Sequence, residues 1–139
     1  MKSLLPAAPG VWRAVPQGCT RTFDGKGEIR TMKPQSVHNF REWFEALHTT
    51  EQSQVAMMRL EPGKETGPEP ESHEASDQVL LVLEGRIEGE VNGEEVTLEK
   101  GEFIIIPAGT PHRFYNDSDV SALTFNVYAP PAYPPDAKG

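Results

Sequence analysis

The sequence predicts an all-β domain built as an antiparallel sandwich or barrel. About seven short runs with an alternation of period two follow one another from residue 55 to residue 129. Turn-forming residues separate the runs, and no helical pattern lies between them, as is typical of antiparallel β architectures. Asn92 and Gly93 also separate two alternating runs, which is the strongest short signal for a β-hairpin.

The chain has 139 residues and suits a single domain that buries its own core. Residues 1–35 are rich in Pro and Gly and show little periodicity, so we expect a poorly defined N-terminal arm there. Residues 36–129 are predicted to form the β-domain. Residues 130–139 form a Pro-rich tail, for which we expect an extended, polyproline-like conformation.

One short helix is predicted at residues 39–50, before the first strand. Asn39 stands at the N-cap position, and Glu42 follows three residues later as in a capping box. Four apolar residues fall at i, i+3, i+4 and i+7 and would share one face of this helix. They are Phe40, Trp43, Phe44 and Leu47.

The remaining elements are strands and one polar, Glu-rich loop at residues 63–77. The predicted strands are residues 55–62, 78–85, 86–91, 94–100, 103–106, 112–116 and 121–129. Phe103, Phe114 and Phe125 are expected in the core. Tyr115, Tyr128 and Tyr133 are expected at edges or interfaces, where one of them can close the mouth of a barrel.

Composition excludes several classes of partner. Lys and Arg number 13 against 21 Asp and Glu, which gives a net charge of -8. Nucleic acids and anionic membranes both require a basic face, so we expect neither as a partner. Cys19 is the single cysteine and no apolar stretch has the length of a membrane span, so we expect a cytoplasmic protein.

The stretch GEFIIIPAGTPHRFYN, residues 101–116, carries the clearest motif. Its glycines permit positive φ at turns, and its proline ends a strand. Taken alone, its histidine could be an ordinary polar residue at the start of a strand. The stretch resembles the second motif of the cupin family, G-x5-P-x-G-x2-H-x3-N, at every fixed position. Those positions are Gly101, Pro107, Gly109, His112 and Asn116.

The sequence also resembles the first cupin motif, G-x5-H-x-H-x3–4-E-x6-G, but only in part. Gly85 takes the place of the closing glycine, and Gln78 stands where the family has glutamate. His73 takes the place of the second histidine, and Glu71 stands where the first one is expected. The opening glycine is absent from its position.

The resemblance covers residues 50–129 and implies a double-stranded β-helix, the jelly-roll barrel of RmlC-like proteins. In the family, the two histidines and the glutamate of the first motif and the histidine of the second bind a divalent metal ion inside the barrel. Carried over to this sequence, the metal ligands are Glu71, His73, Gln78 and His112. The resemblance also implies a homodimer.

These residue types suit a metal site. Two histidines and one carboxylate are the composition that holds non-haem Fe(II), and Zn, Ni or Mn can use the same ligands. Gln78 can offer its carbonyl oxygen directly, or it can form a hydrogen bond with a metal-bound water or a substrate. Spacing to Gly85 favours Gln78 as the inward-facing residue, with Asp77 as the reserve candidate if the loop shifts by one residue.

The function expected from this site is metal-dependent chemistry on a small organic molecule, dioxygenase-like or isomerase-like. The catalytic residues are not identified by the sequence. The alternative is a cupin that binds or senses a ligand without turnover, because the first motif is incomplete.

Overall fold

The computed structural model describes residues 22–23, 29–30 and 33–139. The chain divides into two units, Met1–Gln35 and Ser36–Gly139. In the first unit, β1 (Thr22–Phe23) pairs antiparallel with β2 (Ile29–Arg30). The rest of the predicted N-terminal arm, with Cys19, lies outside the described residues.

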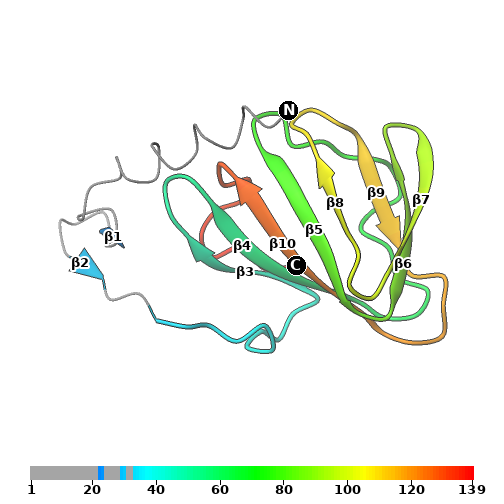
Figure 1. The fold of residues 1–139 in the computed structure, drawn as a ribbon, viewed down its shortest axis with the longest axis horizontal. Helices are drawn as coiled ribbons and strands as arrows, with labels where there is room; N and C mark the ends of the chain where they lie inside the picture. The colour runs from blue at the N-terminus through cyan, green and yellow to red at the C-terminus, as the bar shows by residue number, and fades with distance from the viewer. Residues whose placement is uncertain (1–21, 24–28, 31–32) are drawn as a thin grey trace, which may run out of the picture. The chain divides into compact units, whose positions relative to one another are not determined.

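The second unit consists of two antiparallel sheets (Figure 1). One sheet has the strand order β3-β4-β10-β5-β8, and the other has the order β7-β6-β9. The strands are β3 (Phe44–Thr49), β4 (Gln54–Leu60), β5 (Asp77–Glu84), β6 (Arg86–Val91), β7 (Glu94–Glu99), β8 (Phe103–Ile106), β9 (His112–Tyr115) and β10 (Ala122–Ala129). The predicted all-β antiparallel architecture is therefore confirmed.

The core lies between the two sheets because alternate side chains of each strand point inward. On β5, Leu80 and Val82 are fully buried, whereas Val79 and Leu81 on the opposite face are only partly covered. Ile87 on β6 and Phe114 on β9 join the same hydrophobic cluster from the other sheet. Phe103, which we expected in the core, is instead 62% exposed on the edge strand β8.

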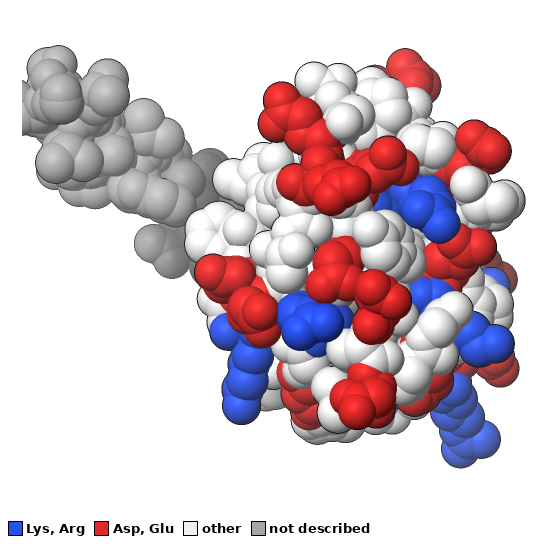
Figure 2. Space-filling view, turned by 90° about the vertical axis from the view of Figure 1, so that its right-hand side faces the viewer, with Lys and Arg blue, Asp and Glu red and all other residues white. Residues whose placement is uncertain are grey.

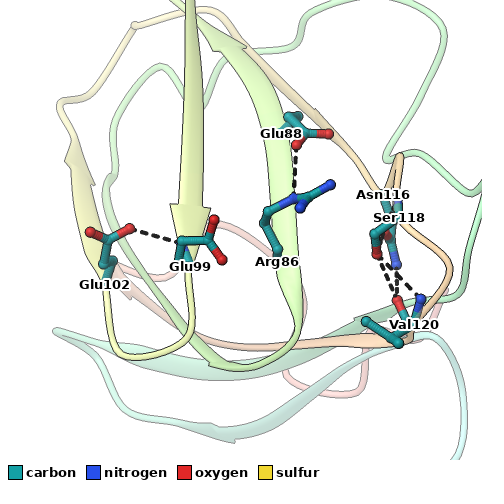
Figure 3. Close-up of polar contacts among 7 residues, drawn as sticks. All are labelled: Arg86, Glu88, Glu99, Glu102, Asn116, Ser118 and Val120. Carbon is teal, nitrogen blue, oxygen red and sulfur yellow. Dashed lines mark hydrogen bonds and ion pairs between the residues drawn. The ribbon is translucent and has the colours of Figure 1, made fainter.

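The β6–β7 hairpin forms where the Asn-Gly signal predicts it. Val91 pairs with Glu94, and the two residues between them have positive φ, 53° at Asn92 and 82° at Gly93. Such backbone angles at both central residues match a type I′ turn, which suits the twist of antiparallel strands. After β7, the Glu102 carboxylate accepts a hydrogen bond from the backbone N–H of Glu99 at 2.8 Å and closes the next turn (Figure 3).

The helix predicted at residues 39–50 is wrong. Phe44–Thr49 forms strand β3, which pairs with β4, and Phe44 lies opposite Met58. The Glu45 carboxylate accepts the backbone N–H groups of Glu42 and Arg41, and these hydrogen bonds lower the pKa of Glu45. Pairing with a neighbouring strand thus overrides the local helical pattern, because it satisfies the same backbone groups and still buries Phe44.

The tail segment, residues 130–139, folds back onto the domain and is not a free polyproline arm. Ala46 donates its backbone N–H to the Ala137 carbonyl at 2.9 Å, and Gly139 donates to the Phe44 carbonyl at 2.7 Å. The tail segment therefore adds a short bridge to the outer edge of β3. This arrangement covers a sheet edge that would otherwise expose unpaired backbone groups.

Asn116, the last fixed residue of the GEFIIIPAGTPHRFYN stretch, supports the turn after β9 (Figure 3). Its side chain is 1% exposed. Its amide donates to the Leu60 carbonyl at 2.8 Å and to the Val120 carbonyl at 2.7 Å, and its oxygen accepts the Ser118 backbone N–H at 2.9 Å. Asn116 therefore holds the turn that joins β9 to β10.

We predict that Asn116→Ala lowers the free energy of unfolding by about 3 kcal/mol, because it leaves two carbonyls and one N–H without their partner. Asn116→Asp should be at least as destabilising, since it keeps the acceptor but loses both donors and buries a charge. The matched control Asp117→Asn changes an exposed neighbour and should stay within about 0.5 kcal/mol of wild type. Urea denaturation measures all three, and equal stability of Asn116→Ala and the control would contradict this role.

Charged side chains of both signs are mixed on the surface drawn in Figure 2. Acidic groups outnumber and separate the Lys and Arg side chains on this face, so no continuous basic patch is visible there. Arg86 contacts Glu88 at 3.0 Å (Figure 3), and Arg113 contacts Glu65. Across the described part of the chain, no helix is long and apolar enough to cross a membrane.

Candidate functional site

A cavity of about 280 Å³ opens between the sheets, and all four predicted metal ligands line it. Gln78 comes from the start of β5 and His112 from the start of β9, while Glu71 and His73 come from the loop before β5. The tail segment contributes a further part of the wall through Tyr133 and residues 137–139. Side chains far apart in the sequence are therefore brought to one place by the strand order.

Backbone hydrogen bonds fix the two motifs against each other. Glu71 and His112 exchange a pair of bonds, with N···O distances of 2.9 Å and 2.8 Å. In an antiparallel bridge of this kind, the two side chains lie on the same side of the backbone and are neighbours. Gly109 donates its N–H to the His73 carbonyl at 2.8 Å. The imidazole rings of His73 and His112 are neighbours, with centroids 5.2 Å apart and planes tilted by 47°.

The hydrogen bond at His112 determines which of its nitrogens is available. Nδ1 lies 2.9 Å from the Thr110 carbonyl, which can only accept, so Nδ1 carries the proton. Nε2 of the neutral ring is then left with a lone pair. Metal-ligating histidines commonly use such a carbonyl to set the tautomer and the ring orientation.

The environment of His73 favours the neutral imidazole. Burial lowers the pKa of His73 below its ordinary value, and the neighbouring His112 lowers it further, while Glu71 acts in the opposite direction. A neutral ring is the form in which histidine binds a metal ion, since the charged form has no free lone pair.

Gln78 is the inward residue, as the spacing to Gly85 predicts. Its side chain is 4% exposed and donates from Nε2 to the Asn126 oxygen at 3.0 Å. Its Oε1 is buried and has no hydrogen-bond partner among the described residues. The reserve candidate Asp77 is exposed, and its carboxylate accepts the Ala108 N–H at 2.9 Å, away from the cavity lining.

Glu71 lies at the same cavity but has an exposed side chain. Its negative charge opposes the lowering of the His73 pKa and adds to the rise that burial causes in the pKa of Tyr133. Over residues 33–139 and the two short N-terminal strands, no three His, Cys, Asp or Glu side chains form a group that could hold a metal ion as they stand. The described arrangement thus brings two imidazoles and the Gln78 amide to the cavity wall, with the Glu71 carboxylate at its exposed side.

Two tyrosines form an aromatic wall beside the histidines. The His73 ring lies edge-on to Tyr128 at 5.1 Å and to Tyr133 at 5.4 Å, and the two tyrosine rings are 5.3 Å apart. Burial raises the pKa of Tyr128 well above its ordinary value, and Tyr133 adds to this shift. Burial also raises the pKa of Tyr133. Both phenols therefore remain protonated and can donate hydrogen bonds.

Several cavity residues were not foreseen from the sequence. Trp43 and Phe44 were assigned to the apolar face of a helix, and Tyr128 and Tyr133 to edges or interfaces. The tail segment has no periodic pattern of apolar residues, so its sequence did not indicate that it forms part of the cavity wall. The alternation of β10 places Tyr128 on the same face as Asn126 and Thr124, and this was the signal available for Tyr128.

The comparisons with known proteins agree with this geometry. The family model described as Cupin domain matches residues 56–128, more than half of the chain. The tetracenomycin polyketide synthase protein TcmJ of Streptomyces glaucescens is 38% identical over 64 residues, which cover 46% of this chain and 43% of that protein. The chain spans about half the length of the curated relatives it matches.

Solved structures show the same fold. The crystal structure of BH2720 from Bacillus halodurans superposes with a TM-score of 0.67 at 29% identity and covers 73% of this chain and 80% of that chain. The sugar phosphate isomerase SPO2919 of Silicibacter pomeroyi superposes with a TM-score of 0.53 at 27% identity, covering 59% and 53%. With its double-stranded barrel, its second motif and the family-model match, the chain belongs to the cupin family.

Proposed function

We propose that the protein is a metal-binding cupin that acts on, or binds, a small organic molecule in the barrel. The observation that carries this proposal is the convergence of Glu71, His73, Gln78 and His112 on one cavity. Fe, Zn, Ni and Mn are the candidate ions, because imidazole and carboxylate ligands suit all four.

The residues present fit a divalent cation. The lowered pKa of His73 favours its neutral ring, and the hydrogen bond from Nδ1 of His112 to the Thr110 carbonyl leaves Nε2 as the nitrogen for a metal ion. The unpartnered Gln78 oxygen is a buried acceptor that a cation or a donor would satisfy. Glu71 is exposed, so its carboxylate is free to adopt another rotamer and supply the negative ligand. A metal held by these groups would act as a Lewis acid or, if redox-active, would support oxygen chemistry.

The cavity favours a small organic ligand. Its volume of about 280 Å³ lies near the lower end for ligand pockets, and aromatic side chains form much of its wall. The protonated Tyr133 would donate a hydrogen bond to a ligand oxygen, while the rings of Tyr128 and Tyr133 exclude water from the bound molecule. A dioxygenase-like or isomerase-like reaction agrees with these features, and the SPO2919 structure belongs to a protein described as an isomerase.

Elemental analysis of protein purified under metal-replete conditions tests the metal part of the proposal. We expect about one equivalent of a divalent ion per chain, lost on chelation and restored on addition of the ion. Protein without stoichiometric metal after this treatment would contradict it.

The second candidate function is ligand binding or sensing without turnover. It is favoured by Gln78, a neutral amide where the family carries a carboxylate, and by the exposed position of Glu71. Thermal-shift screening with product analysis separates the two functions. A binder is stabilised by its ligand with no product formed, because binding to the folded state alone raises the melting temperature. If every stabilising compound were consumed, this candidate would be abandoned.

We also propose a cytoplasmic homodimer. The motive for the dimer is the outer face of β8, an edge strand on which Phe103 is 62% exposed and Ile105 is 58% exposed. These two side chains continue an apolar row on β5, since Phe103 pairs with Leu81 and Ile105 with Val79. A second copy of this chain would cover the face and the open strand edge together.

We therefore expect sedimentation analysis at micromolar concentration to give a dimer for wild type and a monomer for Phe103→Glu/Ile105→Lys. The substitutions place charges in an interface that depends on apolar burial, whereas an exposed residue in an isolated domain tolerates them. Thr97→Lys on β7 serves as the control, because it changes an exposed strand residue of the other sheet. A monomeric wild type would contradict the proposal.

A further inference from the structure

A chain of buried polar side chains runs along the inner face of the five-stranded sheet and ends in the cavity. Gln78, Asn126 and Thr124 are 4%, 1% and 0% exposed. Gln78 Nε2 donates to Asn126 Oδ1 at 3.0 Å, and Asn126 Nδ2 donates to Thr124 Oγ1 at 3.0 Å. This row of side chains is anchored on β4. Asn126 Nδ2 lies 3.4 Å from the Ala56 carbonyl, and Thr124 Oγ1 donates to the Met58 carbonyl at 3.3 Å.

The anchoring carbonyls fix the direction of every bond in this chain. A backbone carbonyl can only accept, so Thr124 must donate to Met58, and Asn126 must turn its NH2 group toward Ala56. The Asn126 oxygen then faces Gln78, and Gln78 must present its own NH2 group. If Asn126 were flipped, its oxygen would lie about as far from the Ala56 oxygen as the NH2 group now does, with no proton between them.

The side-chain carbonyl oxygen of Gln78 is thereby left at the end of this row of hydrogen-bonded side chains. It is buried, has no partner among the described residues, and belongs to a side chain that lines the cavity with His73 and His112. Buried acceptors without a partner are rare in folded proteins, and those at functional sites point to a missing donor or ion.

We propose that Asn126 is a positioning residue that holds Gln78 with its carbonyl oxygen toward the cavity. The site then takes a metal cation, or a ligand with a hydrogen-bond donor such as a hydroxyl or amine, at this point. The proposal deepens the proposed function and rests on it in one respect, namely that the cavity is the ligand site. Gln78 replaces a charged ligand of the family with a neutral one, and Asn126 determines which end of the amide is offered.

Two substitutions of Asn126 separate positioning from a structural role. Asn126→Asp has the same shape and keeps an acceptor for the Gln78 NH2 group, although it loses the donor to Ala56. Asn126→Leu removes both. Each variant should be less stable than wild type, because each disturbs a buried polar chain. Only Asn126→Leu should release the orientation of Gln78.

The probe is Co²⁺ alone, titrated into metal-free full-length protein and followed by its absorption spectrum. Asn126→Asp should bind Co²⁺ at least as tightly as wild type, whereas Asn126→Leu should bind about 10-fold more weakly or worse, as is typical when a partner of a metal ligand is lost. Thr124→Val leaves the Asn126–Gln78 contact in place and should match wild type. Equal Co²⁺ affinity in Asn126→Asp and Asn126→Leu would overturn the proposal.

A second measurement, which needs no metal, separates the proposal of a metal site from the proposal that Asn126 positions Gln78. In wild-type protein, the Gln78 side-chain NH2 signals, assigned by their loss in Gln78→Glu, should exchange slowly with solvent and show contacts to Asn126 by NMR. If wild type binds no Co²⁺ but these signals are protected, the metal proposal fails and the positioning of Gln78 stands. Rapid exchange in wild type would overturn the positioning role, whatever the metal result or the folding of the Leu variant.

Discussion

His112→Ala is expected to abolish stoichiometric metal binding while leaving the fold intact. The substitution removes the Nε2 lone pair of a ring whose tautomer is fixed by the Thr110 carbonyl. Loss of a partner that merely orients a metal ligand costs about 10- to 100-fold in affinity, so loss of the ligand itself should cost about 100-fold or more. Titration of metal-free protein with Zn²⁺ or Co²⁺ measures this change.

The matched control is His48→Ala, which removes an exposed histidine on β3. The control should bind metal as wild type does and should melt at the same temperature. His112 is only partly buried, so the metal-free His112→Ala protein should also unfold close to the wild-type temperature. Equal metal content in His112→Ala and His48→Ala would show that the histidine of the second motif has a purely structural role.

The strands from β4 to β10 could be predicted because the pattern of apolar, polar and turn-forming residues within each segment matches the strand that it forms. Alternation of period two sets the inner and outer faces, and Asn92-Gly93 sets the register of one hairpin. The spacing to Gly85 predicted Gln78 as the inward residue, and the structure buries Gln78 and leaves Asp77 exposed. A motif with fixed turn residues also predicts where His112 lies, since the backbone geometry of its turns is encoded in a few neighbouring residues.

Features that depend on distant partners could not be predicted in this way. Residues 40–47 carry a helical spacing of apolar side chains, yet residues 44–49 form a strand because β4 pairs with them on one side and the tail segment on the other. No local pattern reveals that Tyr133 reaches His73, because the contact is made through loop and tail backbone. The orientation of Gln78 likewise depends on carbonyls of β4, which are invisible in any window around residue 78.

The tail segment leads to the second large effect, at Gln54. This side chain is 1% exposed and forms four hydrogen bonds. Its Nε2 donates to the Tyr133 carbonyl at 2.8 Å and to Thr49 Oγ1 at 2.9 Å. Its Oε1 accepts the backbone N–H groups of Ala132 at 3.2 Å and Tyr133 at 3.0 Å. One glutamine on β4 therefore clamps the segment that carries a wall of the cavity.

We predict that Gln54→Ala lowers the free energy of unfolding by about 3 kcal/mol, because it leaves three partly buried backbone groups of residues 132 and 133 and the Thr49 hydroxyl without their partner. The Tyr133 amide should also exchange with solvent much faster than in wild type, since the local opening of the tail segment becomes easier. Any ligand that depends on the Tyr133 ring should then bind more weakly. Urea denaturation and amide hydrogen exchange measure the first two effects.

Gln52→Ala offers a control of the same residue type two positions earlier, where the side chain is exposed. It should change stability by no more than about 0.5 kcal/mol and should leave the Tyr133 amide protected. Gln54→Glu keeps the acceptor for the two N–H groups but loses both donors. Like Gln54→Ala, it should therefore leave the Tyr133 carbonyl without its hydrogen bond. Unchanged protection of Tyr133 in Gln54→Ala would mean that the strand bridge at residues 137–139 holds the tail segment by itself, and that the clamp has no part in shaping the cavity.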